Sequence, residues 1–242
     1  MSRVAVVTGG ASGIGLGVAK RFVQAGHRVA VLDIQTNAVK QAAQELGALG
    51  IVVDVTDRAA VDAAMAEVRE KLGPIQILVT SAGIDGTAPF SEITIEAWNR
   101  VLAVNLTGTF HCIQSAIGDM VKANWGRVVI ISSSSAQSGA PDRAHYVASK
   151  GGLIGLTKAL SFDFASKGIT VNTIPPSIID TPMARAAATS ANFPGLETIG
   201  MMTPVGRFGV PDDVAAACAF LCSDDAGFIT GQQIGVNGGW YL

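Results

Sequence analysis

The N-terminal segment constrains the fold more than any other part of the chain. Val4 to Val7 is an unbroken apolar run, which is typical of a buried strand. A glycine-rich turn follows at once, and Leu16 to Ala25 then has a helical pattern that stops at Gly26. The backbone N–H groups and helix dipole of such a turn face a bound anion, so the segment predicts a phosphate-binding site. The residues expected in this site are Gly9, Ser12, Gly13, Ile14 and Gly15.

The rest of the chain alternates between strand and helix patterns. Strands are predicted near residues 3–8, 28–33, 50–54, 75–80, 127–132, 169–174 and 233–236. Helices are predicted at 14–25, 36–46, 57–72, 94–122, 145–166 and 211–222. The alternation predicts an α/β fold with a Rossmann-like, doubly wound parallel sheet of about seven strands and helices on both faces. A chain of 242 residues, 49% hydrophobic and 15% charged, fits one such domain spanning residues 1–242.

Asp33 ends the second predicted strand, about twenty residues past the glycine-rich turn. A dinucleotide-binding fold hydrogen-bonds the adenosine ribose at this point, and a carboxylate there accepts from the 2′-hydroxyl and repels a 2′-phosphate. Ile34, Gln35 and Thr36 follow without a nearby arginine that would hold that phosphate, so the predicted cofactor is NAD(H). The glycine spacing is G-x-x-x-G-x-G and not the G-x-G-x-x-G fingerprint, so an ordinary turn capped by an aspartate stays an alternative.

A second group of polar residues, Ser133, Tyr146 and Lys150, predicts acid–base chemistry. Tyr146 and Lys150 are four residues apart, so they share one face of a helix. A free tyrosine phenol titrates near ~10, and a cation held beside it favours the phenolate and lowers the pKa. Ser133 has a hydroxyl that can hold a substrate oxygen while Tyr146 exchanges a proton with it. The set predicts a site that interconverts an alcohol and a carbonyl with the help of a hydride carrier.

These motifs, in this order and spacing, resemble the short-chain dehydrogenase/reductase family over essentially the whole chain. The resemblance rests on Thr8 to Gly15, Asp33, Asp54-Val55, Ala82-Gly83, Asn105, Ser133, Tyr146, Lys150 and Ile179-Asp180-Thr181-Pro182. It implies that Asn105 assists the catalytic set and that Lys150 also holds the nicotinamide ribose. The resemblance further implies that the cofactor site extends to Ile34, Asp54, Val55, Ser81, Ala82, Gly83, Pro176, Ile179 and Thr181, with Asp54 and Val55 along the adenine. No metal site is expected.

Two positions depart from the family pattern. Thr80-Ser81-Ala82-Gly83 stands where the family usually has Asn-Asn-Ala-Gly, so the shorter hydroxyl of Ser81 replaces an amide. Pro175-Pro176-Ser177 stands where the family usually has Pro-Gly, which stiffens the turn after the sixth strand. We expect the first change to affect how the fourth strand is tied to its neighbours, and the second to affect lid motion.

Residues 181–205 have no clean periodicity and contain several prolines and glycines, so we expect a lid after the sixth strand. The apolar members of this segment are Met183, Phe193, Leu196, Ile199, Met201 and Met202. The opposite wall is expected from Ile84 to Pro89 and from Gln137 to His145. An apolar lid that contains methionine suits a small apolar alcohol or ketone, unless these side chains only anchor the lid to the domain.

Composition argues against several kinds of partner. The net charge is −2 and there is no basic run, so nothing indicates nucleic-acid binding. No apolar stretch approaches the ~20 residues that span a bilayer, and the first core strand leaves no room for a signal peptide. The cysteines number three, an odd count, and lie in helical patterns, which indicates reduced thiols. We therefore expect a cytoplasmic protein with no membrane or nucleic-acid partner.

Three functions are compatible with these residues. The leading hypothesis is an NAD(H)-dependent oxidoreductase that interconverts a secondary alcohol and a ketone, with Tyr146 as the acid/base. An alternative is a reductase of 3-oxoacyl thioesters, carried by acyl carrier protein or coenzyme A, with Arg127 and Lys167 in a cationic rim. Asp33 argues against this alternative, because such reductases usually take NADPH. A non-catalytic nucleotide-binding scaffold is the third, although it would have no need of the whole catalytic set.

The C-terminal part of the sequence also predicts self-association. The helix near residues 145–166 contains Gly151, Gly152 and Gly155, and small residues let another helix approach closely. The chain ends at Trp240 to Leu242, and a lone domain rarely leaves such side chains on its surface. The family resemblance implies a homotetramer with twofold symmetry that uses both regions. In the alternative, the terminal residues fold back onto their own subunit.

Overall fold

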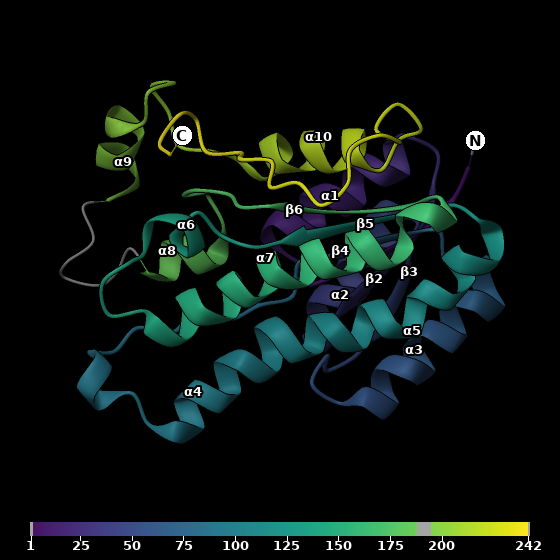
Figure 1. The fold of residues 1–242 in the computed structure, drawn as a ribbon, viewed down its shortest axis with the longest axis horizontal. Coiled ribbons are helices and arrows are strands. Elements are labelled where there is room, and N and C mark those ends of the chain that lie inside the picture. The colour runs from purple at the N-terminus through teal and green to yellow at the C-terminus, as the bar shows by residue number, and fades with distance from the viewer. Residues whose placement is uncertain (1, 188–194, 242) are drawn as a thin grey trace.

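The computed structural model describes residues 2–187 and 195–241 of the chain. Its sheet consists of β1 (Val4–Thr8), β2 (Arg28–Asp33), β3 (Leu49–Val52), β4 (Ile77–Thr80), β5 (Gly126–Ile131) and β6 (Ile169–Ile174). All neighbouring strands are parallel, in the order β3-β2-β1-β4-β5-β6. Figure 1 shows the helices that pack around this sheet. The order reverses between β1 and β4, so the predicted doubly wound α/β fold is confirmed.

Helices connect these strands. They are α1 (Gly13–Gln24), α2 (Thr36–Leu46), α3 (Arg58–Leu72), α4 (Ile95–Leu102), α5 (Gly108–Ala123), α6 (Ser135–Ser138), α7 (Ala144–Phe164), α8 (Pro182–Ala187), α9 (Leu196–Met202) and α10 (Pro211–Leu221). Two 3₁₀ turns, η1 (Phe90–Glu92) and η3 (Ala165–Lys167), and one π turn, η2 (Ala103–Thr107), complete the described elements. The single helix predicted at 94–122 is therefore wrong in one respect, because the π turn separates α4 from α5.

The strand predicted at 233–236 is not a regular seventh strand. This segment runs parallel to the end of β6 and forms isolated bridges, which pair Thr173 with Gln233 and Pro176 with Val236. Proline has no N–H to donate to a ladder, and Pro175 and Pro176 follow β6 directly. A continuous ladder along this edge is therefore interrupted, although the segment occupies the position of a seventh strand.

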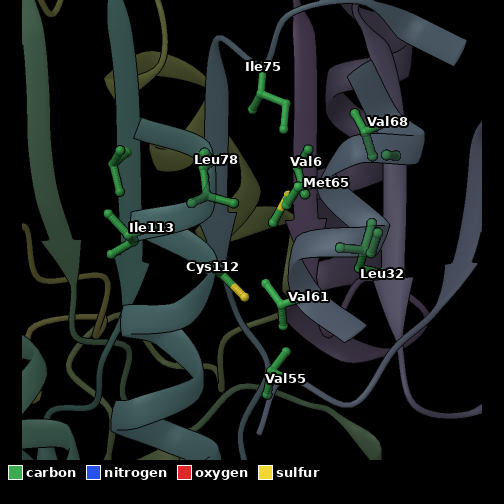
Figure 2. Close-up of a cluster of buried hydrophobic side chains, with 14 of the residues drawn as sticks. Val6, Leu32, Val55, Val61, Met65, Val68, Ile75, Leu78, Cys112 and Ile113 are labelled. Carbon is green, nitrogen blue, oxygen red and sulfur yellow. The ribbon is translucent and has the colours of Figure 1, made fainter. Parts of the chain in front are cut away.

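All strands except β3 send side chains into two separate hydrophobic cores, one on each face of the sheet. Val4 and Val6 of β1 belong to a core on the face covered by α3, α5 and α7. Ala5 and Val7 belong to a core on the opposite face, covered by α1, α2 and α10. Figure 2 shows the first core, where side chains of α3 and α5 meet the sheet. Burial on both faces explains why the strands are almost wholly apolar.

The three cysteines lie inside these cores as free thiols, as the sequence predicts. Cys112 belongs to the first core, and Cys218 and Cys222 belong to the second. Burial raises the pKa of Cys112 and of Cys222 to about 12, which keeps both thiols protonated and inert. Within the described residues, none of the helices has the length and apolar character needed to cross a membrane.

Candidate active site

A cavity of about 780 Å³ lies where the loops leave the carboxyl ends of the strands. Nearly all the site residues expected from the sequence line it: Gly9, Ser12, Gly13, Ile14, Asp33, Ile34, Asp54, Val55, Ser81, Ala82, Gly83, Ser133, Tyr146, Lys150, Pro176, Ile179 and Thr181. Two expected residues, Gly15 and Asn105, lie behind the lining. The structure therefore brings widely separated segments of the chain to one place, at the switch point of the sheet.

The glycine-rich turn after β1 is shaped for close approach of a ligand. Gly9 has a positive φ of 62°, and a Cβ on it would lie 2.7 Å from the backbone nitrogen of Ala82. A Cβ on Gly15 would lie 2.1 Å from the carbonyl oxygen of Gly9. Side chains at these positions would therefore push the turn apart. The first turn of α1 begins at Gly13, so its N–H groups are available at the cavity, and the turn fits a nucleotide phosphate.

Asp33 is held firmly at the end of β2. One of its carboxylate oxygens accepts a hydrogen bond from the backbone N–H of Ala11 at 3.3 Å, and the other accepts from Gln35 at 3.1 Å. The residue is only 8% exposed and yet lines the cavity. Ile34, in contrast, is 60% exposed. The carboxylate is thus oriented by the same turn that approaches the phosphate, which fits a ribose hydroxyl at this point.

Tyr146 lies in the first turn of α7 and is buried beside the loop that follows β5. Tyr146 and Ser133 line the same cavity, as the predicted site requires. Burial raises the pKa of Tyr146 above its usual value, while the Ser133 hydroxyl and the positive charge of Arg143 offset part of this rise. The sequence predicts a lowered pKa instead, because burial at this position cannot be deduced from the spacing.

Lys150 is one helical turn beyond Tyr146, as expected, and its ammonium is buried. The amine donates a hydrogen bond to the carbonyl oxygen of Ile131 at the end of β5, at 3.0 Å. Its nitrogen lies 5.8 Å from the centre of the Tyr146 ring. Burial lowers the pKa of Lys150 to about 8, although the negative charge of Asp85 opposes that change. The ammonium is therefore close to losing its proton in the physiological pH range.

Asn105 lies in the π turn between α4 and α5 and is fully buried. Its amide nitrogen donates to the carbonyl oxygen of Ile84 and to the hydroxyl of Ser149, each at 3.0 Å. Its amide oxygen accepts from the backbone N–H of Ile84 at 2.8 Å. All these bonds fix the loop after β4 against α7, and π turns occur often at functional sites. Asn105 is thus placed to act through this loop and not by direct contact.

Hydrogen bonds hold the chain at both positions that depart from the family pattern. The hydroxyl of Thr8 accepts from the backbone N–H groups of Ser81 and Ala82, at 3.2 and 3.3 Å, and so ties β4 to β1. The hydroxyl of Thr80 is buried and has no hydrogen-bond partner among the described residues. Ser177 is bonded to the C-terminal segment, its hydroxyl donating to the carbonyl oxygen of Asn237 at 3.3 Å. The turn after β6 is therefore attached to the chain's last described residues.

An ion pair on the cavity wall is not predicted by the sequence. Asp85, in the loop after β4, forms an ion pair with Arg143, the residue that precedes α7. The Arg143 guanidinium carbon lies 4.5 Å from the centre of the Tyr146 ring, and both members of the pair line the cavity. The wall segments 84–89 and 137–145 were predicted, but no spacing rule connects residues 58 positions apart. The signal in the sequence is an arginine three residues before Tyr146.

Two expectations about the cavity surroundings need correction. Of the six apolar lid residues, Met183 lines the cavity, whereas Ile199 is buried elsewhere and Met201 and Met202 are exposed. The structure has two short helices here, α8 and α9; the side chain of Leu196 is not described, and Phe193 lies outside the described residues. The prediction of a cationic rim at the cavity is wrong. Arg127 is buried near the amino end of β5, and Lys167 lies just before the amino end of β6, so both are away from the cavity.

The fold and the cavity define a nucleotide-dependent oxidoreductase. A Rossmann-like sheet, a glycine-rich turn and a Ser-Tyr-Lys set all meet at one edge, and no group of metal-ligating side chains occurs within residues 2–187 and 195–241. The family model for enoyl-(acyl carrier protein) reductase matches residues 9–241. The chain belongs to the short-chain dehydrogenase/reductase family, whose members use a nicotinamide nucleotide.

Several known proteins are similar to the chain over its full length. An acetoacetyl-CoA reductase from Rhizobium meliloti (strain 1021) is 43% identical and covers 100% of both chains. A D-threitol dehydrogenase from Mycolicibacterium smegmatis is 36% identical over 99% of this chain and 93% of its own. The crystal structure of an actinorhodin polyketide ketoreductase variant with NADPH is 35% identical, with a TM-score of 0.94, covering 99% of this chain and 98% of the other.

Proposed function

We propose that the chain is an NAD(H)-dependent oxidoreductase that interconverts a secondary alcohol and a ketone. The observation that carries this proposal is that Ser133, Tyr146 and the buried Lys150 all line one cavity, with Lys150 one helical turn beyond Tyr146. The three groups lie beside the turn that fits a nucleotide phosphate, so hydride and proton transfer can occur at one carbon–oxygen bond.

Each residue has a distinct part in the proposed reaction. A bound nicotinamide supplies or accepts the hydride. Ser133 donates a hydrogen bond to the substrate oxygen, while Tyr146 gives that oxygen a proton in reduction and removes it in oxidation. Lys150 holds the ribose hydroxyls and, while charged, favours the phenolate of Tyr146. Asn105 positions the loop at Ile84, which supports the wall of the cavity.

Asp33 is the basis for proposing NAD(H) as the cofactor. Its carboxylate is fixed by two backbone N–H groups and lines the cavity, so a ribose 2′-hydroxyl can donate to it. A 2′-phosphate at the same place would be repelled by the negative charge of Asp33. The residues that follow Asp33 in the cavity lining are Ile34 and Gln35, neither of which has a positive charge to hold that phosphate. The ketoreductase structure contains NADPH, but that cofactor belongs to the other protein.

A 3-oxoacyl thioester is the specific ketone that the relatives favour. An acetoacetyl-CoA reductase is among the proteins similar to this chain over its whole length. The polar pair of Asp85 and Arg143 on the cavity wall is also poorly suited to a small, wholly apolar substrate. Because the acetoacetyl-CoA reductase is 43% identical to this chain, we favour a coenzyme A thioester over one on acyl carrier protein. The small apolar alcohol or ketone stays as the second candidate.

A cofactor and substrate panel tests these proposals together. The purified chain would be supplied with NADH or NADPH and with acetoacetyl-CoA or simple ketones, and oxidation of the cofactor would be followed by absorbance. We expect turnover with NADH, and faster turnover with acetoacetyl-CoA than with simple ketones. Turnover with simple ketones alone would exclude the thioester. Turnover only with NADPH would exclude the cofactor assignment, and no turnover in either direction would exclude the function.

We also propose a homotetramer. A Cβ added to Gly151 or Gly155 would meet no atom of the described residues within 4 Å, so this flank of α7 is open in the part of the chain that the structure describes. Phe162 is on the same flank, seven residues beyond Gly155, and is 90% exposed. At the C-terminus, Trp240 is 42% exposed, but the hydroxyl of Tyr241 donates to Gln137 of its own subunit. The α7 flank therefore supports association more strongly than the C-terminal segment does.

We also propose that residues 1–242 form one catalytic domain and that the protein is cytoplasmic. Free, buried cysteines support a reducing compartment, because none of the three takes part in a disulfide. The small net charge of −2 gives no reason to add a nucleic-acid partner. Fractionation of cells that express the tagged full chain would test the location.

A further inference from the structure

Arg143 lies next to Tyr146, the proposed acid/base, but has no part in the reaction as proposed so far. Its guanidinium carbon is 4.5 Å from the centre of the Tyr146 ring, and it lines the same cavity. Lys150 is farther away, with its nitrogen 5.8 Å from that centre. Arg143 is therefore the nearer of the two cations to the phenol's ring.

The backbone around Arg143 is fixed to the opposite wall of the cavity. The carbonyl oxygen of Asp142 accepts from the backbone N–H of Ala88 at 2.8 Å. Asp142 has a φ of 55°, a conformation that is uncommon outside glycine but tolerated by aspartate. A Cβ on Gly86 would lie 2.3 Å from Nε2 of His145, so the two segments are in close contact. The backbone of Arg143 therefore cannot shift relative to the opposite wall without breaking these contacts.

The side chain of Arg143 is also held. Its Nε donates to the carboxylate of Asp85 at 3.1 Å, and a second guanidinium nitrogen completes the ion pair with the same oxygen. The side chains of Arg143 and Asp85 are only 27% and 22% exposed. Because both side chains are partly buried, solvent and salt screen the attraction between their charges less than they would at the surface. The pair thus holds the guanidinium over the tyrosine and does not leave it to sample the solvent.

The two cations near Tyr146 differ in how they respond to pH. Burial lowers the pKa of Lys150 to about 8, so its charge is lost as the pH rises through that value. A guanidinium keeps its charge throughout the pH range in which proteins function. The other polar groups facing Tyr146 are Asp85, whose charge disfavours the phenolate, and the neutral Ser133 hydroxyl; the neighbouring His145 directs its ring to Gly86.

We propose that Arg143, held by Asp85, is a positioning residue that places a permanent positive charge against Tyr146 and so favours its phenolate. The inference rests on the proposed function only in assigning Tyr146 as the acid/base. Arg143 supplies its charge without touching the reacting atoms, and it does so at pH values where Lys150 has become neutral. The Arg143 charge also lowers the pKa of Tyr146 in the direction that the proposal requires.

Fluorine NMR tests the proposal without any substrate. The chain has two tyrosines, Tyr146 and Tyr241, so replacing tyrosine by a fluorotyrosine of more acidic phenol gives two signals. A Tyr241→Phe variant assigns them. We expect Arg143→Gln to raise the titration midpoint of Tyr146 by about 0.5–1 pH unit, and Arg143→Lys to raise it by less than about half as much. The Tyr241 signal should not move, and it reports an intact fold.

A kinetic measurement adds the catalytic consequence. In alcohol oxidation, kcat/KM rises with pH as Tyr146 ionises, and Arg143→Gln should move the midpoint of that rise upward by a similar amount. A fall in kcat/KM with an unchanged midpoint in both measurements would overturn the proposal, because it would mean that Arg143 only supports the wall. Equal shifts in Arg143→Lys and Arg143→Gln would overturn it too. An NMR shift without any turnover would instead refute the proposed function alone.

Discussion

Replacing Asp33 by alanine and Ile34 by arginine should reverse the proposed preference for NAD(H). The first change removes the carboxylate that faces the cavity at the end of β2. The second places a guanidinium at a side chain that is 60% exposed and already lines the cavity, so no packed neighbour has to move. Together they exchange repulsion of a 2′-phosphate for attraction.

The size of the effect follows from two contributions. Two unit charges about 4 Å apart repel by about 1 kcal/mol in water and by about 4 kcal/mol at the effective dielectric constant of a protein surface. The cavity is open, so loss of the Asp33 charge should favour NADPH by an amount between these limits. A charge-assisted hydrogen bond from the new arginine adds about 1.5–3 kcal/mol. The sum corresponds to a change of about 10²- to 10⁵-fold in the cofactor preference.

The assay is the ratio of kcat/KM for NADPH to that for NADH, measured with one ketone. Asp33→Asn is the matched control, because its amide oxygen can still accept from Ala11 or Gln35 while the charge is lost. It should show only the part of the change that arises from repulsion. The reasoning would be refuted if the unmodified chain used NADPH as well as NADH, or if the folded double variant changed the ratio by less than about tenfold.

Four further outcomes are expected. Tyr146→Phe removes the proposed proton carrier, so turnover should fall by at least about 10²–10⁴ while calorimetry still detects NAD binding. Folded Lys150 loses its proton near pH 8 and the unfolded chain near ~10.4, so stability should rise with pH across this window by up to roughly 3 kcal/mol. Urea unfolding of Lys150→Met should lack that rise. Gly15→Ala places a Cβ 2.1 Å from a carbonyl oxygen and should weaken cofactor binding, whereas Gly118→Ala, on the exposed side of α5, meets no described atom within 4 Å and should raise the melting temperature slightly. Deleting Trp240 to Leu242, the last of which lies outside the described residues, should weaken the proposed tetramer, and light scattering of the unmodified chain as a monomer would contradict it.

Much of the fold could be predicted because its signals are local. Each buried strand is a short apolar run followed by a helical pattern, and all six strands, β1 to β6, begin and end within two residues of their predicted positions. The irregular seventh position could not be foreseen, because it depends on which neighbour the C-terminal segment meets. The π turn was missed for a similar reason, since the bonds of Asn105 to Ile84 and Ser149 connect residues 21 and 44 positions away.

The candidate site shows the same division. Ser133, Tyr146 and Lys150 are related by spacing along one loop and one helix, so their proximity could be predicted. The raised pKa of Tyr146 could not, because burial depends on segments from elsewhere in the chain. The pairing of Asp85 with Arg143 joins the ends of two different strand–helix units. Only the assembled sheet brings those ends together.

The π turn at Ala103–Thr107 lets α4 and α5 differ in their rotation about the helix axis, so that each can face its own neighbours. A π turn contains one residue more than an α turn, and one residue rotates a helix by about 100°. Deleting a single residue there would therefore join α4 and α5 into one regular helix, but it would also turn α4 by about a quarter of a revolution relative to α5. The extra residue thus separates two requirements: α5 keeps its apolar face on the sheet, while Asn105 keeps its amide on the loop after β4. Insertions and deletions should be tolerated in the outer loops of this chain well before they are tolerated in this turn.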